Sequence, residues 1–176
     1  MVQVSVHAEL KKTGPVDELT DFHHQLIYAT VDIGNAPYQF GGNDQEKGLD
    51  CSSYIQNIYK TVGIELARST RDQVRDSRFF KVPLESRSSG DLIFFKNTYR
   101  KGVSHVGIFI DHDYFAHASS GDHQVVIEQF SKSRYFKKRF YQLKRLKSDV
   151  QNKISNRYLA SNPDSAQDNS EDDSED

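Results

Sequence analysis

The chain of 176 residues contains a single cysteine, Cys51. One thiol cannot close a disulfide within its own chain, and its isolation excludes both a disulfide framework and metal sites built from several thiolates. The sequence also lacks any apolar run near the ~20 residues needed to cross a bilayer, so we expect no membrane span. Cys51 is therefore either a small buried apolar side chain or a reactive nucleophile.

A secretory signal is also missing from the start of the sequence. Residues 1–10 have neither the basic beginning nor the long apolar run of a signal peptide. We therefore expect a cytoplasmic protein, an effector exported by another route, or an envelope, periplasmic or secreted protein whose leader was removed. The mixture of both charge signs, with a net charge of −2, favours a monomer by default.

Acidic residues gather at the end of the chain. Residues 161–176 contain seven acids, no base and no aromatic side chain. Such a segment buries too little apolar surface to offset the entropy lost on ordering, so we expect it to be disordered. We divide the chain into an irregular lead-in at 1–16, one folded domain at 17–150 and an acidic, disordered tail at 151–176.

Basic residues gather just before this tail. Residues 132–147 contain eight Lys and Arg side chains and no acid. A basic stretch attracts anionic polymers, among them nucleic acid and cell-wall polymer, although a solvated strand face is the simpler alternative. We predict an anionic wall polymer, and not nucleic acid, as the partner of five of these side chains: Lys132, Arg134, Lys137, Lys138 and Arg139.

The apolar pattern predicts helices first and strands afterwards. Helical spacing, with Asp50 and Gly63 as end signals for the second helix, predicts helices at 17–33, 51–62 and 70–76. Runs of β-branched and aromatic residues between turn signals predict strands at 91–95, 103–110, 114–118, 125–129 and 140–146. This order predicts an α+β fold in which N-terminal helices pack on a small, mainly antiparallel sheet.

Cys51 falls at the start of the second predicted helix, directly after its N-cap Asp50. The positive end of the helix dipole and the unpaired backbone N–H groups favour a thiolate at that position, an arrangement that lowers a thiol pKa. This placement favours a nucleophile over a merely buried thiol.

Two histidines stand within predicted strands. His105 begins the apolar run 106–110, and His117 is flanked by alanines. A polar ring in a buried strand needs a partner, so we predict that His105 takes the proton of Cys51 and that His117 orients His105. Satisfied core histidines are the alternative. His112 and His123 lie among aspartates in turns, but their spacing fits no standard ligand pattern, and we expect neither a metal nor a cofactor.

Six short motifs in order resemble the NlpC/P60 family of cell-wall cysteine endopeptidases, and together they span roughly residues 20–147. They are Pro37-Tyr38-Gln39-Phe40-Gly41-Gly42, Leu49-Asp50-Cys51-Ser52-Ser53, Arg68-Ser69-Thr70, Gly90-Asp91-Leu92-Ile93-Phe94-Phe95, Ser104-His105-Val106-Gly107-Ile108 and His117-Ala118-Ser119.

The resemblance implies a papain-like α+β fold and a catalytic triad of Cys51, His105 and His117. It also implies hydrolysis of peptidoglycan stem peptides at the bond between D-γ-glutamate and a diamino acid, through an acyl-enzyme on Cys51. The backbone N–H of Cys51 would donate to the oxyanion. The substrate-binding residues that the matched motifs suggest are Tyr38, Asp50, Ser52, Arg68, Thr70 and Ser104.

The sequence departs from the family pattern at three positions. Ser53 replaces the usual glycine, Phe40 stands where tryptophan is common, and Ala67 stands where proline is usual. These changes leave the catalytic groups in place and affect the expected substrate preference. An acyltransferase or amidase with a non-wall substrate, or an effector with the same hydrolase chemistry, are the alternatives. A binding module with a relict site is disfavoured because all three catalytic side chains are present.

Overall fold

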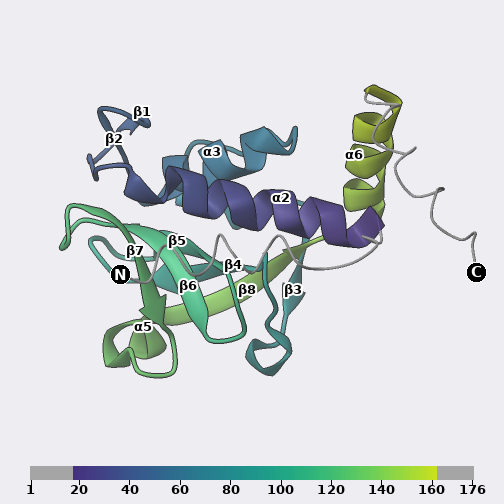
Figure 1. Cartoon of the computed structure of the whole chain (residues 1–176). Helices are drawn as coiled ribbons and strands as arrows, with labels where there is room; N and C mark the ends of the chain where they lie inside the picture. Colours follow the sequence, from purple (N-terminus) through teal and green to yellow (C-terminus); the bar gives the residue numbers. More distant parts are fainter. Residues whose placement is uncertain (1–17, 162–176) are drawn as a thin grey trace, which may run out of the picture.

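The computed structural model describes residues 18–161, which form a helical layer on one side of a sheet (Figure 1). Two helices make most of this layer, α2 (Glu18–Asp32) and α3 (Cys51–Thr61). The remaining helical segments are the 3-10 turns η1 (Ile33–Asn35) and η2 (Leu84–Ser86), with α4 (Thr70–Gln73), α5 (Arg134–Arg139) and α6 (Ser148–Ser161). Within this part of the chain, no helix has the length and apolar character needed to cross a membrane.

The main sheet has six strands in the order β3-β8-β4-β5-β6-β7, and every neighbouring pair is antiparallel. Its strands are β3 (Phe79–Val82), β4 (Leu92–Lys96), β5 (Val103–Phe109), β6 (Tyr114–Ser119), β7 (Gln124–Gln129) and β8 (Phe140–Leu146). A separate short hairpin joins β1 (Asn43–Asp44) to β2 (Gly48–Leu49). The predicted α+β, papain-like architecture is confirmed.

Alternation along the strands divides the buried side chains between the two faces of the sheet. Leu92, Phe94, Val106 and Ile108 belong to the core that also contains the buried residues of α2 and α3. Their neighbours along β4 and β5, such as Ile93, Phe95 and Phe109, pack with Phe115 and with Phe136 of α5 in a second cluster. Strands β4 and β5 are thus buried on both faces of the sheet, and α5 covers the face opposite the main helices.

Helix α3 is fixed in the core by two buried tyrosines. The hydroxyl of Tyr54 donates to the carbonyl oxygen of Thr30 in α2 at 2.8 Å, and that of Tyr59 donates to the carbonyl oxygen of Gly90 at 3.3 Å. Both rings are therefore buried among apolar side chains, while their hydroxyl groups keep a hydrogen-bond partner. These contacts set the position of the first turn of α3 against the sheet.

The structure corrects the prediction in several places. Strand β3 and helix α5 were not predicted, and α4 is shorter than the predicted 70–76. Helix α6 runs across the predicted boundary at 150 to Ser161, because Val150 and Ile154 pack against the core and Gln151 is buried. The lead-in at 1–16 and the rest of the predicted tail, 162–176, lie outside the described residues.

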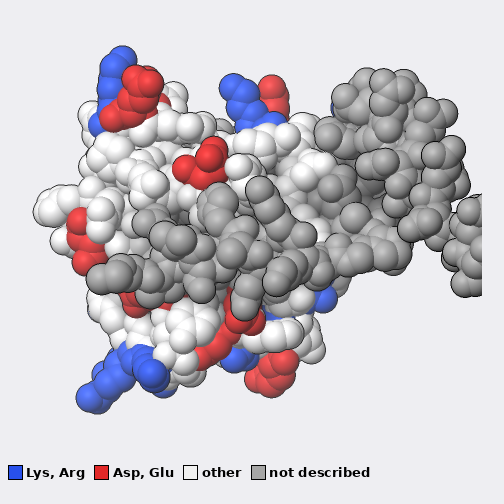
Figure 2. Space-filling view, in the orientation of Figure 1, with Lys and Arg blue, Asp and Glu red and all other residues white. Residues whose placement is uncertain are grey.

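The basic stretch 132–147 is not one surface. Arg145 pairs with Asp91, Lys144 donates to the carbonyl oxygen of Phe79, and Arg139 donates to that of Asn97. Most of the exposed charges that remain lie on and beside α5, where Figure 2 shows Lys and Arg side chains at the lower left, and the exposed Lys147 lies just after the end of β8. The fold thus separates α5 from the charges of β8, which pair within the molecule.

Candidate active site

Cys51 is the first residue of α3, and a capping box holds that helix end. The Asp50 carboxylate accepts a hydrogen bond from the backbone N–H of Ser53 at 2.9 Å, and the Ser53 hydroxyl accepts one from the backbone N–H of Asp50 at 2.9 Å. A side-chain cap of this kind stabilises a helix by about 1 kcal/mol. Ser53, one of the three residues that depart from the family pattern, therefore has a structural role in the first turn of the helix that begins at Cys51.

The Cys51 thiol is nearly enclosed, with 4% of the residue exposed. Its sulfur lies 3.7 Å from the hydroxyl of Thr70 and 4.0 Å from the carbonyl oxygen of Ser104. Burial raises the pKa of this thiol to about 11; hydrogen bonding to Thr70 opposes the rise, and the charge of Asp50 adds to it. The sequence argument that the helix start lowers this pKa is therefore wrong for the enclosed thiol, because desolvation outweighs the helix dipole.

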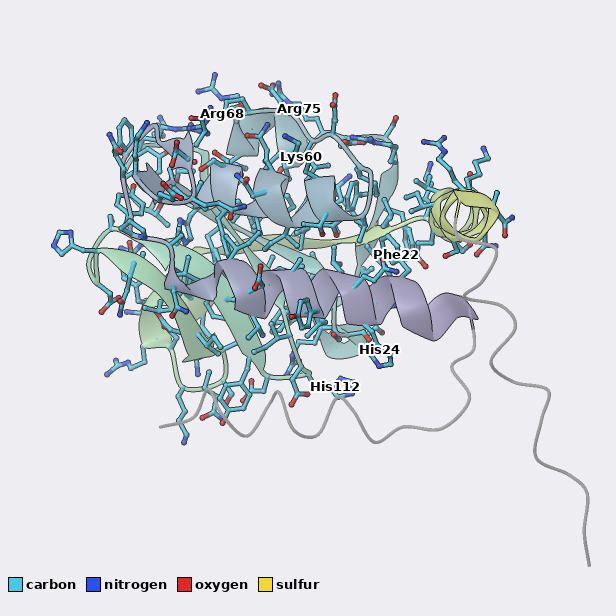
Figure 3. All side chains as sticks on the ribbon, turned by 45° about the horizontal axis from the view of Figure 1, so that its top comes forward. Phe22, His24, Lys60, Arg68, Arg75 and His112 are labelled. Atoms are coloured by element: carbon cyan, nitrogen blue, oxygen red, sulfur yellow. The ribbon has the colours of Figure 1, made fainter. Side chains whose placement is uncertain are left out.

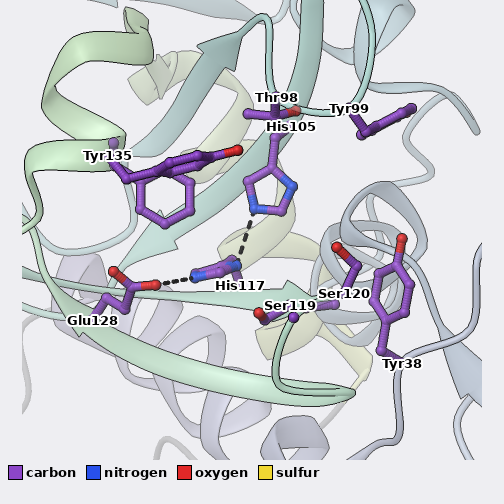
Figure 4. A pocket seen from close by; sticks show the side chains of 12 residues that line it. Tyr38, Thr98, Tyr99, His105, His117, Ser119, Ser120, Glu128 and Tyr135 are labelled. Atoms are coloured by element: carbon purple, nitrogen blue, oxygen red, sulfur yellow. Dashed lines mark hydrogen bonds and ion pairs between the residues drawn. The ribbon is translucent and has the colours of Figure 1, made fainter.

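The two predicted histidines lie in contact, and a third group extends the contact. Nε2 of His105 lies 3.0 Å from Nδ1 of His117, and Nε2 of His117 lies 3.2 Å from Oε1 of Glu128 (Figure 4). The residues come from the three adjacent strands β5, β6 and β7. The structure thus brings together the predicted base and its predicted orienting residue, and it adds a carboxylate.

Aromatic side chains surround this histidine pair. The His105 ring stacks on Phe136 at a centroid distance of 5.7 Å, and the His117 ring stacks on Phe115 at 5.2 Å. Burial, and then the neighbouring His117 ring, lower the pKa of His105 well below its usual value. At neutral pH His105 is therefore an uncharged imidazole, which is able to accept a proton.

A cavity of about 360 Å³ opens beside the histidines. Its walls combine the histidine pair and Glu128 with two hydroxyl-bearing loops and three tyrosines (Figure 4). Its lining residues are Tyr38, Thr98, Tyr99, His105, His117, Ala118, Ser119, Ser120, Gly121, Glu128, Tyr135 and Phe136. Cys51 is not among the lining residues; its sulfur lies against the carbonyl oxygen of Ser104, the residue before His105. Within residues 18–161 the thiol has no hydrogen bond to the His105 ring.

Three of the predicted binding residues form one linked cluster at the start of α3. The Arg68 guanidinium donates to both carboxylate oxygens of Asp50, at 2.9 and 2.7 Å, and to the Ser52 hydroxyl at 2.9 Å. Burial opposes the ionisation of Asp50, but Arg68, the Ser53 N–H and the Ser52 hydroxyl together hold the pKa of this carboxyl below its usual value. These side chains brace the start of α3, with Arg68 at the molecular surface (Figure 3).

The other three predicted binding residues have separate places. Tyr38 lines the cavity, and burial, followed by the charges of Cys51 and Asp50, raises its pKa to about 12, so its hydroxyl stays a donor at neutral pH. Thr70 contacts the thiol. The Ser104 hydroxyl bonds to Thr98, 2.7 Å from its hydroxyl oxygen, so it supports the loop after β4.

Gly107 lets β5 and β6 approach each other beside the histidines. A Cβ atom at this position would lie 2.8 Å from the carbonyl oxygen of Ala116, 2.9 Å from the Phe115 ring and 3.3 Å from Cβ of His117. Two of these neighbours are a backbone atom and a buried ring, which cannot easily move aside. The absence of a side chain at 107 is therefore a requirement for the position of His117.

We expect Gly107→Ala to destabilise the protein by about 2 kcal/mol, because the added methyl overpacks the strand pair. The displacement of β6 would also move His117 away from His105 and lower kcat/KM roughly 10- to 100-fold. Thermal unfolding measures the loss of stability, and the rate of peptide cleavage measures the loss of kcat/KM. The matched control is Gly34→Ala, since nothing lies within 4 Å of a Cβ added there. Equal behaviour of the two variants would contradict this role of Gly107.

Sequence reasoning missed Glu128 and the aromatic walls of the cavity. Glu128 stands in the predicted strand 125–129, whose β-branched residues indicate a strand but give no sign of a partner on β6. Tyr99 and Tyr135 lie in a loop and in the unpredicted helix α5. Only the strand order, which places β7 beside β6, connects Glu128 with His117.

Metal ligands do not gather in the described part of the chain. Within residues 18–161, no group of three or more His, Cys, Asp or Glu side chains could hold a metal ion. The reactive side chains described above are a thiol, two imidazoles and a carboxylate.

The profile of the NlpC/P60 family matches residues 34–145. The bifunctional muramidase/DL-endopeptidase CwlT of Bacillus subtilis is 33% identical over 101 residues, covering 57% of this chain and 30% of that protein. The murein DD-endopeptidase MepS/murein LD-carboxypeptidase of Escherichia coli K12 is 35% identical over 131 residues, covering 73% and 65%.

A solved structure agrees with these sequence matches. A lipoprotein-like NLP/P60 protein of Staphylococcus aureus superposes with a TM-score of 0.65 at 29% identity, covering 80% of this chain and 46% of that one. The chain thus spans less than two thirds of the length of each of these three proteins.

Proposed function

The chain belongs to the NlpC/P60 family, and on that premise we propose that it is a cysteine peptidase that hydrolyses stem peptides of peptidoglycan. The observation that carries the proposal is the pairing of His105 with His117, 3.0 Å apart, in the wall of a cavity, while the sulfur of the buried Cys51 lies 4.0 Å from the carbonyl oxygen of Ser104, the residue before His105. Its relatives CwlT and MepS carry endopeptidase names.

In the proposed reaction, the neutral thiol and the neutral imidazole act together. His105 takes the thiol proton while the sulfur of Cys51 attacks the peptide carbonyl carbon. The lowered pKa of His105 and the raised pKa of Cys51 fit a proton that moves during attack rather than a pre-formed ion pair. The backbone N–H of Cys51, in the first turn of α3, has no partner inside the helix and would donate to the oxyanion.

The intermediate then resolves in two steps. His105 returns the proton to the leaving amine as the C–N bond breaks, which leaves a thioester on Cys51. Water then loses a proton to His105 and attacks the thioester; the C–S bond breaks, and the proton returns to the thiolate. His117 would hold the His105 ring throughout.

For the bond cleaved, we favour that between D-γ-glutamate and the diamino acid. This choice rests on the matched motifs and on the DL-endopeptidase name of CwlT, since this bond joins a D- to an L-residue. A second candidate is the D,D cross-link, because MepS, which covers more of this chain, carries a DD-endopeptidase name. The exposed charges Lys132, Arg134 and Lys138 would add a salt-sensitive attraction to an anionic wall.

Mass spectrometry of defined muropeptides tests this function. The purified chain would be incubated with uncross-linked tetrapeptides and, separately, with D,D-cross-linked dimers. We expect fragments split after D-γ-glutamate from the uncross-linked substrate. Cleavage confined to the cross-link would establish the second bond instead. If both substrates and intact sacculi stayed whole, a non-wall amide or an acyl acceptor other than water would replace this proposal.

A further inference from the structure

Glu128 lies at the end of the chain of contacts that begins at His105. We propose that Glu128 is a positioning residue, whose carboxylate acts through His117 to fix the proton of His105 on Nε2 and to keep Nδ1 of His105 unprotonated. The tautomer assignment stands on the geometry of the three groups and on which of their atoms donate and accept hydrogen bonds. Its catalytic consequence rests on the proposed function, in which His105 is the base.

Three adjacent strands align the three groups. His105 on β5 is 9% exposed, His117 on β6 is 2% exposed, and Glu128 on β7 is 35% exposed. Pairing of Phe115 with Glu128 and of His117 with Val126 places Glu128 on the diagonal from His117. Neighbours on the diagonal of an antiparallel pair are within reach of long side chains. The register of β6 and β7 thus places the Glu128 carboxylate next to Nε2 of His117, the ring nitrogen that does not contact His105.

The proton positions follow from what each group is able to donate. An ionised carboxylate only accepts hydrogen bonds, so Nε2 of His117 must carry a proton to bond Oε1 of Glu128 at 3.2 Å. In an uncharged His117 ring, Nδ1 then has a lone pair and accepts. The contact of 3.0 Å to His105 therefore requires that Nε2 of His105 donates. In the neutral His105 ring, Nδ1 is left as the basic nitrogen.

The surroundings of the rings offer no competing partner. Phe95, Phe115 and Phe136 pack around the two histidines, and none of these side chains carries a hydrogen-bonding group. In the described residues, the two rings form hydrogen bonds with each other and with Glu128. Without the Glu128 carboxylate, either ring could donate the hydrogen bond between His105 and His117. When His117 donates, the neutral His105 ring carries its proton on Nδ1, and the nitrogen that would act as the base is blocked.

Glu128 also borders the cavity, so a second role has to be distinguished. A carboxylate in a cavity wall can bind a cationic group of a substrate, and its loss would then raise KM and leave kcat unchanged. A positioning residue acts on the base instead, so its loss lowers kcat with little change in KM. Measuring kcat and KM separately in a variant without the Glu128 carboxylate therefore distinguishes the two roles.

Nitrogen NMR of the whole chain labelled with ¹⁵N-histidine reads the tautomers directly and needs no substrate. In the unmodified protein at neutral pH, we expect both histidines to carry protons on Nε2 and none on Nδ1. In Glu128→Ala we expect a mixture of tautomers at His105, and kcat lower by roughly 10- to 100-fold. Glu128→Gln should recover much of both properties, because its amide oxygen accepts the same bond. The control is Glu46→Gln, an exposed carboxylate in the β1–β2 turn.

A proton on Nδ1 of His105 in the unmodified protein would overturn the proposal, as would unchanged tautomers in Glu128→Ala. A raised KM with unchanged kcat would show a substrate contact instead. Should the chain fail to cleave any stem peptide, the proposed function would fail, while the NMR spectra would still decide the tautomer assignment.

Discussion

Cleavage of stem peptides is expected to stop when Cys51 is replaced by alanine. The substitution removes the sulfur that forms the thioester, and Cys51 is the only cysteine of the sequence. Loss of a covalent nucleophile lowers kcat/KM by roughly ten-thousandfold or more, or about 5 kcal/mol of transition-state stabilisation. The measurement is the yield of fragments from the muropeptide digests, resolved by mass.

The Cys51→Ala variant should remain folded and should still bind wall material. The side chain is small, and the capping box of α3 involves Asp50 and Ser53 rather than the thiol. Thermal unfolding and pelleting with sacculi at low and high salt check both expectations. His105→Ala should show a similar loss of cleavage, with His24→Ala on α2 as its matched control. Full hydrolysis by Cys51→Ala would refute the thioester mechanism.

Asp91→Ala is expected to destabilise the chain by about 3 kcal/mol. The Asp91 side chain is fully buried, and its carboxylate accepts two bonds from Arg145, at 2.7 and 2.8 Å, and one from the backbone N–H of Ser88 at 2.8 Å. Removing one partner of a buried pair costs several kcal/mol, because the other charge and the N–H lose their partner. Arg145 is 31% exposed and can regain water, which keeps the cost at the lower end.

A loss of about 3 kcal/mol corresponds to a melting temperature lower by roughly 10 °C for a chain of this size. The control is Lys47→Ala, which removes a surface ion pair to Asp44 at 3.6 Å and should cost less than about 1 kcal/mol. In the double variant Asp91→Ala/Arg145→Ala, the cost should be smaller than the sum of the two single costs, because the two residues act as a pair. Additive costs would mean that the pair contributes no coupling energy.

Local sequence signals were sufficient for the elements that depend on neighbours in the chain. Asp50 and Ser53 cap α3 through bonds that span three residues, so the placement of Cys51 at a helix start is readable from the sequence. Strand 140–146 was predicted with its observed bounds for the same reason. Helix α5 was missed because its stability comes from Phe136, whose ring packs on the face of the sheet against Phe95 and Phe115.

The sequence by itself determined the residue types of the site, the helix that begins at Cys51 and the α+β order of the chain, because these follow from local hydrogen bonds and apolar spacing. Only the tertiary structure decided which groups meet. Strand order puts Glu128 beside His117, and packing of the helical layer on the sheet buries the thiol and raises its pKa. Arg145 and Asp91 pair across β8 and β4, which removes a charge from the predicted basic surface. These contacts join residues far apart in the chain, so they depend on register and burial, which no short segment specifies.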